Sequence, residues 1–395
     1  MGIGEDGITG LSKQARDLIE SAQVVFGGTR HLSLAAPLIR GSARPWSSPF
    51  DRSVAEVLAH RGRRVCVLAS GDPFQHGIGP LLARQVQAEE AVTVPAVSAF
   101  SLAAARLLWP LAQTSLLSVC GRSPDLVRPH LQPGTRLLVL TSDSSTPAAL
   151  AQLLCTAGFG ESRITVLEAL GGPRERIRTA RACEFGLDAI DPLNTLAVEV
   201  AAGPDARVLP RSAGLDDDLF EHDGQITKRE VRAVTLSALA PRRGEHLWDI
   251  GAGSGSVGIE WMLADTSLSA VAIERSPDRA ARIRRNAATC GVPDLLVIEG
   301  IVPEALEGLR TPHAVFIGGG ATVPGLIEAV QAALHPGGRL VINAVTLETE
   351  AILSSRHAQA GGSLTRLEIS RAGSVGRMTG WHPARPVTQW TWVKP

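Results

Sequence analysis

The residues whose types and spacing point most directly to chemistry lie in a glycine-rich turn at 247–258. An apolar segment that ends at Asp249 leads into three glycines at alternate positions, and a helix is expected to follow. Glycine adopts backbone angles that other residues avoid, and its missing side chain lets a ligand lie against the main chain. We therefore expect a cofactor to bind at this turn. Its candidate cofactor-binding residues are Asp249, Gly251, Ala252, Gly253, Ser254 and Gly255.

Two cofactors compete for such a turn. Residues 253–258 fit the G-x-G-x-x-G pattern of dinucleotide sites. S-adenosylmethionine carries a free ammonium group that Asp249 could meet, and Glu274 ends the next predicted strand, where a carboxylate accepts hydrogen bonds from ribose hydroxyls. A Pro-Gly-Gly turn and a late strand at 334–343 complete an arrangement typical of class I methyltransferases. We favour S-adenosylmethionine over a dinucleotide, and over a glycine turn without a ligand.

Composition narrows the classes of function. The 395 residues predict two domains, and 39 basic and 39 acidic residues leave no net charge to attract nucleic acid or an anionic membrane. An anionic substrate must therefore meet a local basic pocket. The five cysteines form no C-x-x-C pair and the histidines form no H-x-x-x-H pair, so neither a disulfide framework nor a metal is indicated. No signal sequence or long apolar run is present, which predicts a cytoplasmic protein without membrane contact.

Helical and extended patterns alternate along the chain, which predicts an α/β fold with mainly parallel sheets. The alternation lapses in a stretch of small, polar and helix-breaking residues near the middle. We place a linker at 204–219, between a domain at 1–203 and a domain at 220–395. The two halves share no repeat, so the chain is expected to be a fusion of unrelated domains.

Near the start of the C-terminal half we expect a helix that runs to Ala240, because Pro241 cannot continue it. Thr227 and Glu230 have the spacing of a capping box at its start. Thr227 is also a candidate ligand residue, because a helix start that faces a cofactor is a polar binding surface.

The N-terminal half has four loops of its own that could bind a ligand. They lie at 2–7, at 68–79 around a Gly-Asp-Pro sequence, at 94–101 and at 167–176. Any open α/β sheet needs such loops at the carboxyl ends of its strands, so each alone is weak evidence. The candidate cofactor-binding residues in them are Gly4, Gly71, Asp72, Pro73, Ser98 and Leu170.

In this order the four loops resemble those of the class III tetrapyrrole methyltransferases, in which a cleft between two α/β subdomains binds S-adenosylmethionine. The segments at 224–230, 248–256 and 343–348 resemble a class I methyltransferase of cobalamin biosynthesis. The whole chain is similar to the decarboxylating precorrin C5,15-methyltransferases. The resemblance implies a two-subdomain tetrapyrrole methylase fold followed by a Rossmann-like class I domain, with one S-adenosylmethionine in each. It also implies a cofactor contact at Val302.

The same resemblance implies a tetrapyrrole substrate, a precorrin. The N-terminal domain would methylate carbon 5, and the C-terminal domain would methylate carbon 15 and release carbon dioxide from the ring C acetate. We also expect a homo-oligomer. Members of the class III family begin with an apolar strand before the first glycine turn, whereas here Met1 directly precedes Gly2. We therefore expect that strand to be missing, through a late start codon or through trimming.

Methyl transfer is an in-line displacement that needs alignment and exclusion of water, not a protein nucleophile. At most a base is needed, and His222 and His313 are candidates. The glycines at 318–320 would leave room for a large flat substrate. Guanidinium groups should meet its carboxylates. The substrate-binding candidates are Lys228, Arg229, Arg232, Arg371 and Arg377.

Two other functions stay open at this point. The chain could methylate RNA or protein, although it lacks the basic stripe that nucleic-acid binding needs. It could also be a scaffold that senses S-adenosylmethionine without turnover.

Overall fold

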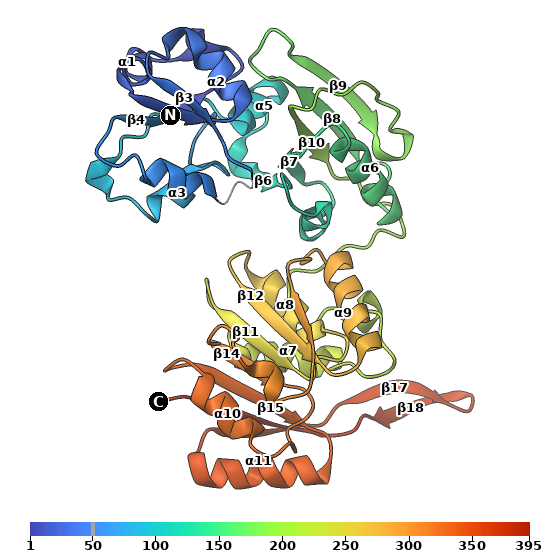
Figure 1. Cartoon of the computed structure of the whole chain (residues 1–395). Helices are drawn as coiled ribbons and strands as arrows, with labels where there is room; N and C mark the ends of the chain where they lie inside the picture. The colour runs from blue at the N-terminus through green and yellow to red at the C-terminus, as the bar shows by residue number, and fades with distance from the viewer. Residues whose placement is uncertain (49–51) are drawn as a thin grey trace. The chain divides into compact units, whose positions relative to one another are not determined.

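The computed structural model describes residues 1–48 and 52–395, which form two compact units (Figure 1). The N-terminal unit contains residues 1–124 and 130–206, and the C-terminal unit contains residues 125–129 and 207–395. Each unit has its own sheets, covered by helices. No helix in the described ranges is both long and apolar enough to cross a membrane.

The first part of the N-terminal unit has a parallel sheet in the order β3-β2-β4 and a separate parallel pair of β1 and β5. Ser12 is the N-cap of α1, and its side chain accepts a hydrogen bond from the amide of Ala15 at 3.2 Å. The strands are β1 (Gly2–Ile3), β2 (Val24–Gly27), β3 (Ser42–Pro45), β4 (Val65–Val67) and β5 (Ala69–Ser70). The helices are α1 (Lys13–Ser21), α2 (Thr29–Ala35), α3 (Arg52–Leu58) and α4 (Gly79–Ala83).

The strand that we expected to be missing at the start of the chain is present as β1. Gly2 pairs with Ala69 and Ile3 pairs with Ser70. A side chain at Gly2 would lie 1.9 Å from the carbonyl oxygen of Gly71, so this strand runs directly against the loop that follows β5. Ile3 is fully buried and joins the apolar core of this part of the unit.

The second part of the N-terminal unit is a five-stranded sheet in the order β6-β7-β10-β8-β9. Only β6 and β7 are parallel, so the expectation of mainly parallel sheets is wrong for this part. The connection from β8 to β9 contains no crossover helix, and a short connection can join only antiparallel neighbours. The strands are β6 (Thr114–Ser118), β7 (Arg136–Leu140), β8 (Arg163–Glu168), β9 (Arg176–Arg181) and β10 (Asn194–Glu199). The helices are α5 (Ala99–Leu107) and α6 (Thr146–Thr156).

The C-terminal unit has a seven-stranded sheet in the order β13-β12-β11-β14-β15-β19-β16. The first five strands in this order are parallel, and β19 is antiparallel to both of its neighbours. Strands β17 and β18 form a separate hairpin that extends from the sheet (Figure 1). The strands are β11 (His246–Ile250), β12 (Ser269–Glu274), β13 (Leu296–Glu299), β14 (Ala314–Ile317), β15 (Arg339–Ala344), β16 (Ser363–Leu367), β17 (Ser370–Val375), β18 (Met378–Pro383) and β19 (Val387–Val393). The helices are α7 (Arg229–Leu239), α8 (Ser256–Ala264), α9 (Pro277–Thr289), α10 (Leu326–Ala333) and α11 (Leu347–Ala360).

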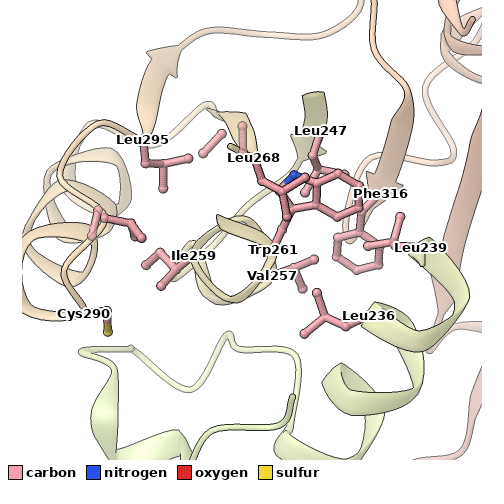
Figure 2. Close-up of a cluster of buried hydrophobic side chains, with 14 of the residues drawn as sticks. Leu236, Leu239, Leu247, Val257, Ile259, Trp261, Leu268, Cys290, Leu295 and Phe316 are labelled. Carbon is pink, nitrogen blue, oxygen red and sulfur yellow. The ribbon is translucent and has the colours of Figure 1, made fainter. Parts of the chain in front are cut away.

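Alternate residues of the central strands face opposite sides of this sheet and form two apolar cores. Leu247 and Phe316 belong to the core under α7, α8 and α9, where Trp261 is fully buried (Figure 2). Trp248 and Ile317 belong to the core on the other face, with residues of α10. Burial on both faces explains why these strands carry few polar residues.

The segment that we expected to be a linker contributes to the first of these cores. Leu209 and Leu215 are buried in it, together with Phe220. The residues from Arg207 onward belong to the C-terminal unit, so the chain passes from one unit to the other between Ala206 and Arg207.

Candidate active sites

The glycine turn of the C-terminal unit lies at the point where the order of the parallel strands reverses. From β11 the sheet continues to β12 on one side and to β14 on the other. In open α/β sheets, ligands bind outside the carboxyl ends of the strands at this point. The loops after β12, β13 and β14 end at the same edge, because all these strands are parallel.

All three glycines of the turn have positive φ angles, of 66° at Gly251, 60° at Gly253 and 77° at Gly255. A side chain at Gly251 would lie 2.7 Å from the carbonyl oxygen of Gly319, so the two glycine loops pack backbone against backbone. At Gly253 the nearest atom, the carbonyl oxygen of Gln225, is 3.2 Å away. The turn therefore needs glycine for its conformation and, at Gly251, also for space.

Asp249 is buried beneath the surface and holds the start of α8 next to this turn. Its Oδ2 accepts a hydrogen bond from the amide of Gly258 at 2.8 Å. The N-cap residue of α8 is Gly255, which has no side chain to cap the helix, so Asp249 caps the first turn instead. Burial raises the pKa of Asp249 to about 7, and the charge of Glu274 acts in the same direction. The side chain is only 1% exposed, so it leaves almost no surface for the ammonium group that we expected it to meet.

Glu274 ends β12 and holds two backbone amides. Its Oε2 accepts a hydrogen bond from Gly253 at 2.9 Å, and its Oε1 accepts one from Ser276 at 3.0 Å. The side chain is 4% exposed. An ionised carboxylate has about four acceptor sites, and these two amides occupy two of them.

The remaining candidates at this edge are less polar. Ser254 is buried, and its carbonyl oxygen accepts a hydrogen bond from the Asn286 side chain at 2.9 Å. The amide of Ala252 donates to the carbonyl oxygen of Ile273 at 3.2 Å. Val302 lies 3.8 Å from the position of a Cβ at Gly320, so the loops after β13 and β14 meet.

The predicted capping box at the start of α7 is wrong by one residue. The N-cap is Lys228, whose side chain makes no capping hydrogen bond, and the helix begins at Arg229. Thr227 stands one position earlier, and its carbonyl oxygen accepts a hydrogen bond from Arg232. Its hydroxyl therefore has no structural role as a cap, and Thr227 is kept as a proposed cofactor contact.

Arg232 is not a substrate-binding residue, because its side chain is fully buried. Its guanidinium pairs with Glu260 and Asp217 and donates to the carbonyl oxygen of Leu215. A charge at a helix start usually faces solvent, but here acidic groups and carbonyls from distant parts of the chain enclose it. Arg232 stabilises the packing of the segment before α7.

Of the four other basic candidates, Arg229, Arg371 and Arg377 are exposed and Lys228 is half-buried. Lys228 pairs with Asp217 at 3.4 Å, Arg229 pairs with Asp216, and Arg371 of the hairpin pairs with Glu230. These contacts bring three cations together around the start of α7. Arg377 is exposed in the turn between β17 and β18.

The two candidate histidines differ in position. His313 directly precedes β14 and therefore lies at the amino edge of the sheet, opposite the glycine turn, where its Nδ1 accepts a hydrogen bond from the amide of His246 at 3.1 Å. It cannot act as a proton carrier at that turn. His222 lies in the segment before α7, and its Nδ1 accepts a hydrogen bond from the amide of Gly224 at 3.0 Å.

The N-terminal unit contains a cavity of about 470 Å³ lined by both of its parts. Five of the six cofactor-binding candidates of this half line it: Gly4, Gly71, Asp72, Ser98 and Leu170. The sixth, Pro73, shapes the neighbouring loop through its carbonyl oxygen, which accepts a hydrogen bond from Gly79 at 2.9 Å.

Two of the cavity loops touch each other. A side chain at Gly71, where φ is 53°, would lie 2.9 Å from the Cα of Ser98. Glycine is therefore required where the Gly-Asp-Pro loop meets the start of α5. Ser98 also caps α5, since its side chain accepts a hydrogen bond from the amide of Ser101 at 3.2 Å.

A polar cluster in this cavity was not predicted from the sequence. Arg30, His31 and Ser70 line it together with Glu5, and they are joined by hydrogen bonds. A signal was present in the sequence, because the apolar strand β2 runs into Gly27 and Gly28 before an Arg-His pair at the start of α2.

Comparison with known proteins decides the family. The family model described as tetrapyrrole (corrin/porphyrin) methylases matches residues 1–185, and the one described as precorrin methyltransferase domain matches residues 218–394. The precorrin-6Y C(5,15)-methyltransferase (decarboxylating) of a Sinorhizobium species is 60% identical over 394 residues, which cover 100% of this chain and 95% of that protein. The chain belongs to the precorrin-6Y C(5,15)-methyltransferase (decarboxylating) family. It is therefore a methyltransferase.

Other relatives of this family agree. The protein of the same name from Mycobacterium tuberculosis is 42% identical over 400 residues, which cover 100% of this chain and 99% of that protein. The cobalt-precorrin-6B C(15)-methyltransferase (decarboxylating) of Salmonella typhimurium is 34% identical over 179 residues, 44% of this chain and 92% of that protein. The predicted fold class, a tetrapyrrole methylase fold followed by a Rossmann-like domain, and the predicted family are confirmed.

Proposed function

We propose that this methyltransferase transfers two methyl groups from S-adenosylmethionine to a precorrin, at carbons 5 and 15, and removes the carboxyl group of the ring C acetate. Each unit binds its own S-adenosylmethionine. The N-terminal unit methylates carbon 5, and the C-terminal unit methylates carbon 15 and decarboxylates. The observation that carries the proposal is that one chain, 60% identical over its whole length to a protein of that name, contains two dissimilar candidate sites.

The C-terminal edge fits S-adenosylmethionine. At Gly253 the one atom near the position of a Cβ is the backbone oxygen of Gln225, so no side chain from elsewhere in the chain covers this point of the turn. Glu274 ends the adjacent strand, and two backbone amides occupy only two of its acceptor sites. We propose that Glu274 accepts hydrogen bonds from the ribose hydroxyls of the cofactor. Thr227, Ala252 and Val302 would contact the cofactor on either side. Asp249 contributes indirectly, because it holds α8 against the turn.

The N-terminal cavity fits a second molecule of the same cofactor. Its volume of about 470 Å³ is in the range of small-molecule sites, and Gly4 and Gly71 both line it. Ser98 and Leu170 complete the proposed cofactor contacts on the second part of the unit.

When bound, S-adenosylmethionine supplies a methyl group on a positively charged sulfur, which a nucleophilic carbon takes by in-line displacement. The task of the protein is therefore to fix the substrate carbon in line and to keep water out. In the C-terminal unit, the exposed glycines at 318–320 leave the space beside the turn open for a flat macrocycle. Lys228, Arg229 and Arg371 surround the nearby start of α7 and would bind its carboxylates.

Loss of carbon dioxide leaves an electron pair that the electron-poor macrocycle can accept, so the protein need not provide an electron sink. Its contribution would be to hold the acetate out of contact with the cations that would stabilise its charge. His222, in the segment that precedes α7, is the candidate for moving a proton at this site.

The proposal is tested by incubating the full chain with the precorrin and methyl-labelled S-adenosylmethionine and by measuring the mass of the product by mass spectrometry. We expect a gain of two labelled methyl groups and the loss of one carbon dioxide. Label in RNA or protein would instead support a methyltransferase for macromolecules, and cofactor binding without any labelled product would support a sensor.

Two expectations about the setting of the enzyme remain predictions. We propose that it works in the cytoplasm without membrane or nucleic-acid partners. We also propose that it forms a homo-oligomer, which light scattering on the purified protein would reveal.

A further inference from the structure

Arg30 projects from the start of α2 into the N-terminal cavity and is held there by three neighbours. Its Nη1 donates to Oε1 of Glu5, and its Nη2 donates to the Ser70 hydroxyl at 2.7 Å. The Nη2 atom also lies 2.9 Å from Nε2 of His31. The guanidinium is thus fixed by groups from three separate segments.

His31 is a neutral member of this cluster. A guanidinium can only donate hydrogen bonds, so the Nε2 that faces it is an acceptor and the ring proton lies on Nδ1. Burial lowers the pKa of His31 to about 4, and the charge of Arg30 acts in the same direction. The ring therefore does not compete with Arg30 as a cation at neutral pH.

Glu5 neutralises Arg30 only in part, because it is shared. Its Oε2 lies 3.5 Å from Nη2 of Arg174, which also pairs with Asp191. Glu5 is 10% exposed and Arg30 is 34% exposed, so the carboxylate is inside and the guanidinium reaches the edge of the cavity. Arg30 has five N–H donors and these contacts use three, which leaves two for an anion.

We propose that Arg30 binds a peripheral carboxylate of the substrate in the N-terminal cavity. This contact would select a tetrapyrrole acid as the substrate of the N-terminal site. This inference rests on the proposed function. The carboxylates of a precorrin lie around the rim of its ring, where a guanidinium at the cavity edge would meet them. Glu5 and Ser70 are positioning residues that orient the guanidinium.

The test is Arg30→Met in the full chain, with methylation at carbon 5 followed by mass and the affinity for S-adenosylmethionine measured by titration. We expect KM for the precorrin to rise about ten- to hundredfold, the loss that follows from removing a charged hydrogen bond. The value of kcat and the affinity for S-adenosylmethionine should stay nearly unchanged. Arg40→Met is the matched control, because Arg40 pairs with Glu20 on the surface of the same unit.

Arg30→Met leaves Glu5 without one of its two partners, so Arg30→Met/Glu5→Gln is the second variant. It removes the unpaired carboxylate and should fold as the wild type does, with the same raised KM. A substrate with esterified carboxyl groups should reduce the difference between wild type and variant, because the ester offers no anion to Arg30.

Three results would overturn the inference. An unchanged KM in both variants would make Arg30 purely structural. An equal loss of affinity for S-adenosylmethionine would assign Arg30 to the carboxylate of the cofactor, and an undiminished difference on the ester would exclude a substrate carboxylate. Failure of the proposed function is a separate outcome, since the wild type itself would then place no methyl group on the precorrin.

Discussion

Glu274 accepts a hydrogen bond from the amide of Gly253 at 2.9 Å, so the end of one strand holds the glycine turn that follows its neighbour. The second carboxylate oxygen bonds to Ser276, which fixes the side chain between the turn and the start of the next helix. The residue that we propose binds the cofactor ribose therefore also fixes the conformation of the glycine turn.

Glu274→Ala should weaken the binding of S-adenosylmethionine to the C-terminal site by about 1–3 kcal/mol, the cost of an unmatched partner of a charged hydrogen bond. Two-site calorimetry on the full chain measures both sites at once, and the N-terminal site should not change. Glu299→Ala is the control, because Glu299 pairs with Glu274 in the strand register but binds Arg284 at the surface. Equal effects of both substitutions would contradict the assignment.

Gly251→Ala should abolish cofactor binding at the C-terminal site and destabilise that unit. The added methyl group meets the Gly319 backbone at 2.7 Å, in addition to the strain of a positive φ. Gly325→Ala carries a similar strain, with φ of 79°, but meets nothing within 4 Å. Thermal unfolding should therefore show a larger loss for Gly251→Ala, and a loss no larger than that of Gly325→Ala would refute the close packing of the two loops.

Arg232→Met should cost about 3–5 kcal/mol of unfolding free energy, because it leaves the buried Glu260 without its cation. Arg229→Met, three residues earlier on the same helix, breaks only an exposed pair with Asp216 and should cost about 0–1 kcal/mol. Denaturant titration of both variants gives the comparison. If both cost little, the ion pair of Arg232 with Glu260 does not stabilise the C-terminal unit.

Asp249 should make the stability of the C-terminal unit depend on pH. Its folded pKa of about 7 lies above the value of about 4 expected for the unfolded chain, so the folded state holds the proton more tightly. Relative to Asp249→Asn, the wild type should be most stable below about pH 4 and should lose stability as the pH rises to about 7. Unfolding curves across this range check the slope, and the opposite sign would mean that the carboxylate is stabilised as an anion.

The local features of the C-terminal site could be predicted from sequence because they depend on short-range constraints. Three alternate glycines directly after a strand indicate a turn with positive φ angles, and the structure has them at all three. The position of His313 was also open to prediction, because a residue that precedes a strand of a parallel sheet lies at the amino edge.

Features that depend on distant partners could not be predicted. The partners of Arg232 are 15 and 28 residues away, and no local pattern marks them. Asp249 was expected to face a ligand because strand ends do so, but its hydrogen bond to Gly258 turns it inward. The cluster around Arg30 joins residues 25 and 40 positions apart, and only the folded cavity brings them together.

The most direct test of the central claim, two separate sites with a division of labour, is the product of Gly253→Val. The bulky side chain at a φ of 60° should distort the turn and block the C-terminal site, while the N-terminal unit keeps its own cores and cavity. Gly376→Val is the control, because it has the same strain, with φ of 61°, in the exposed hairpin turn and meets nothing within 4 Å. Mass spectrometry should show that the product of Gly253→Val gains one methyl group and keeps its acetate carboxyl, whereas a product that has lost carbon dioxide would contradict the account.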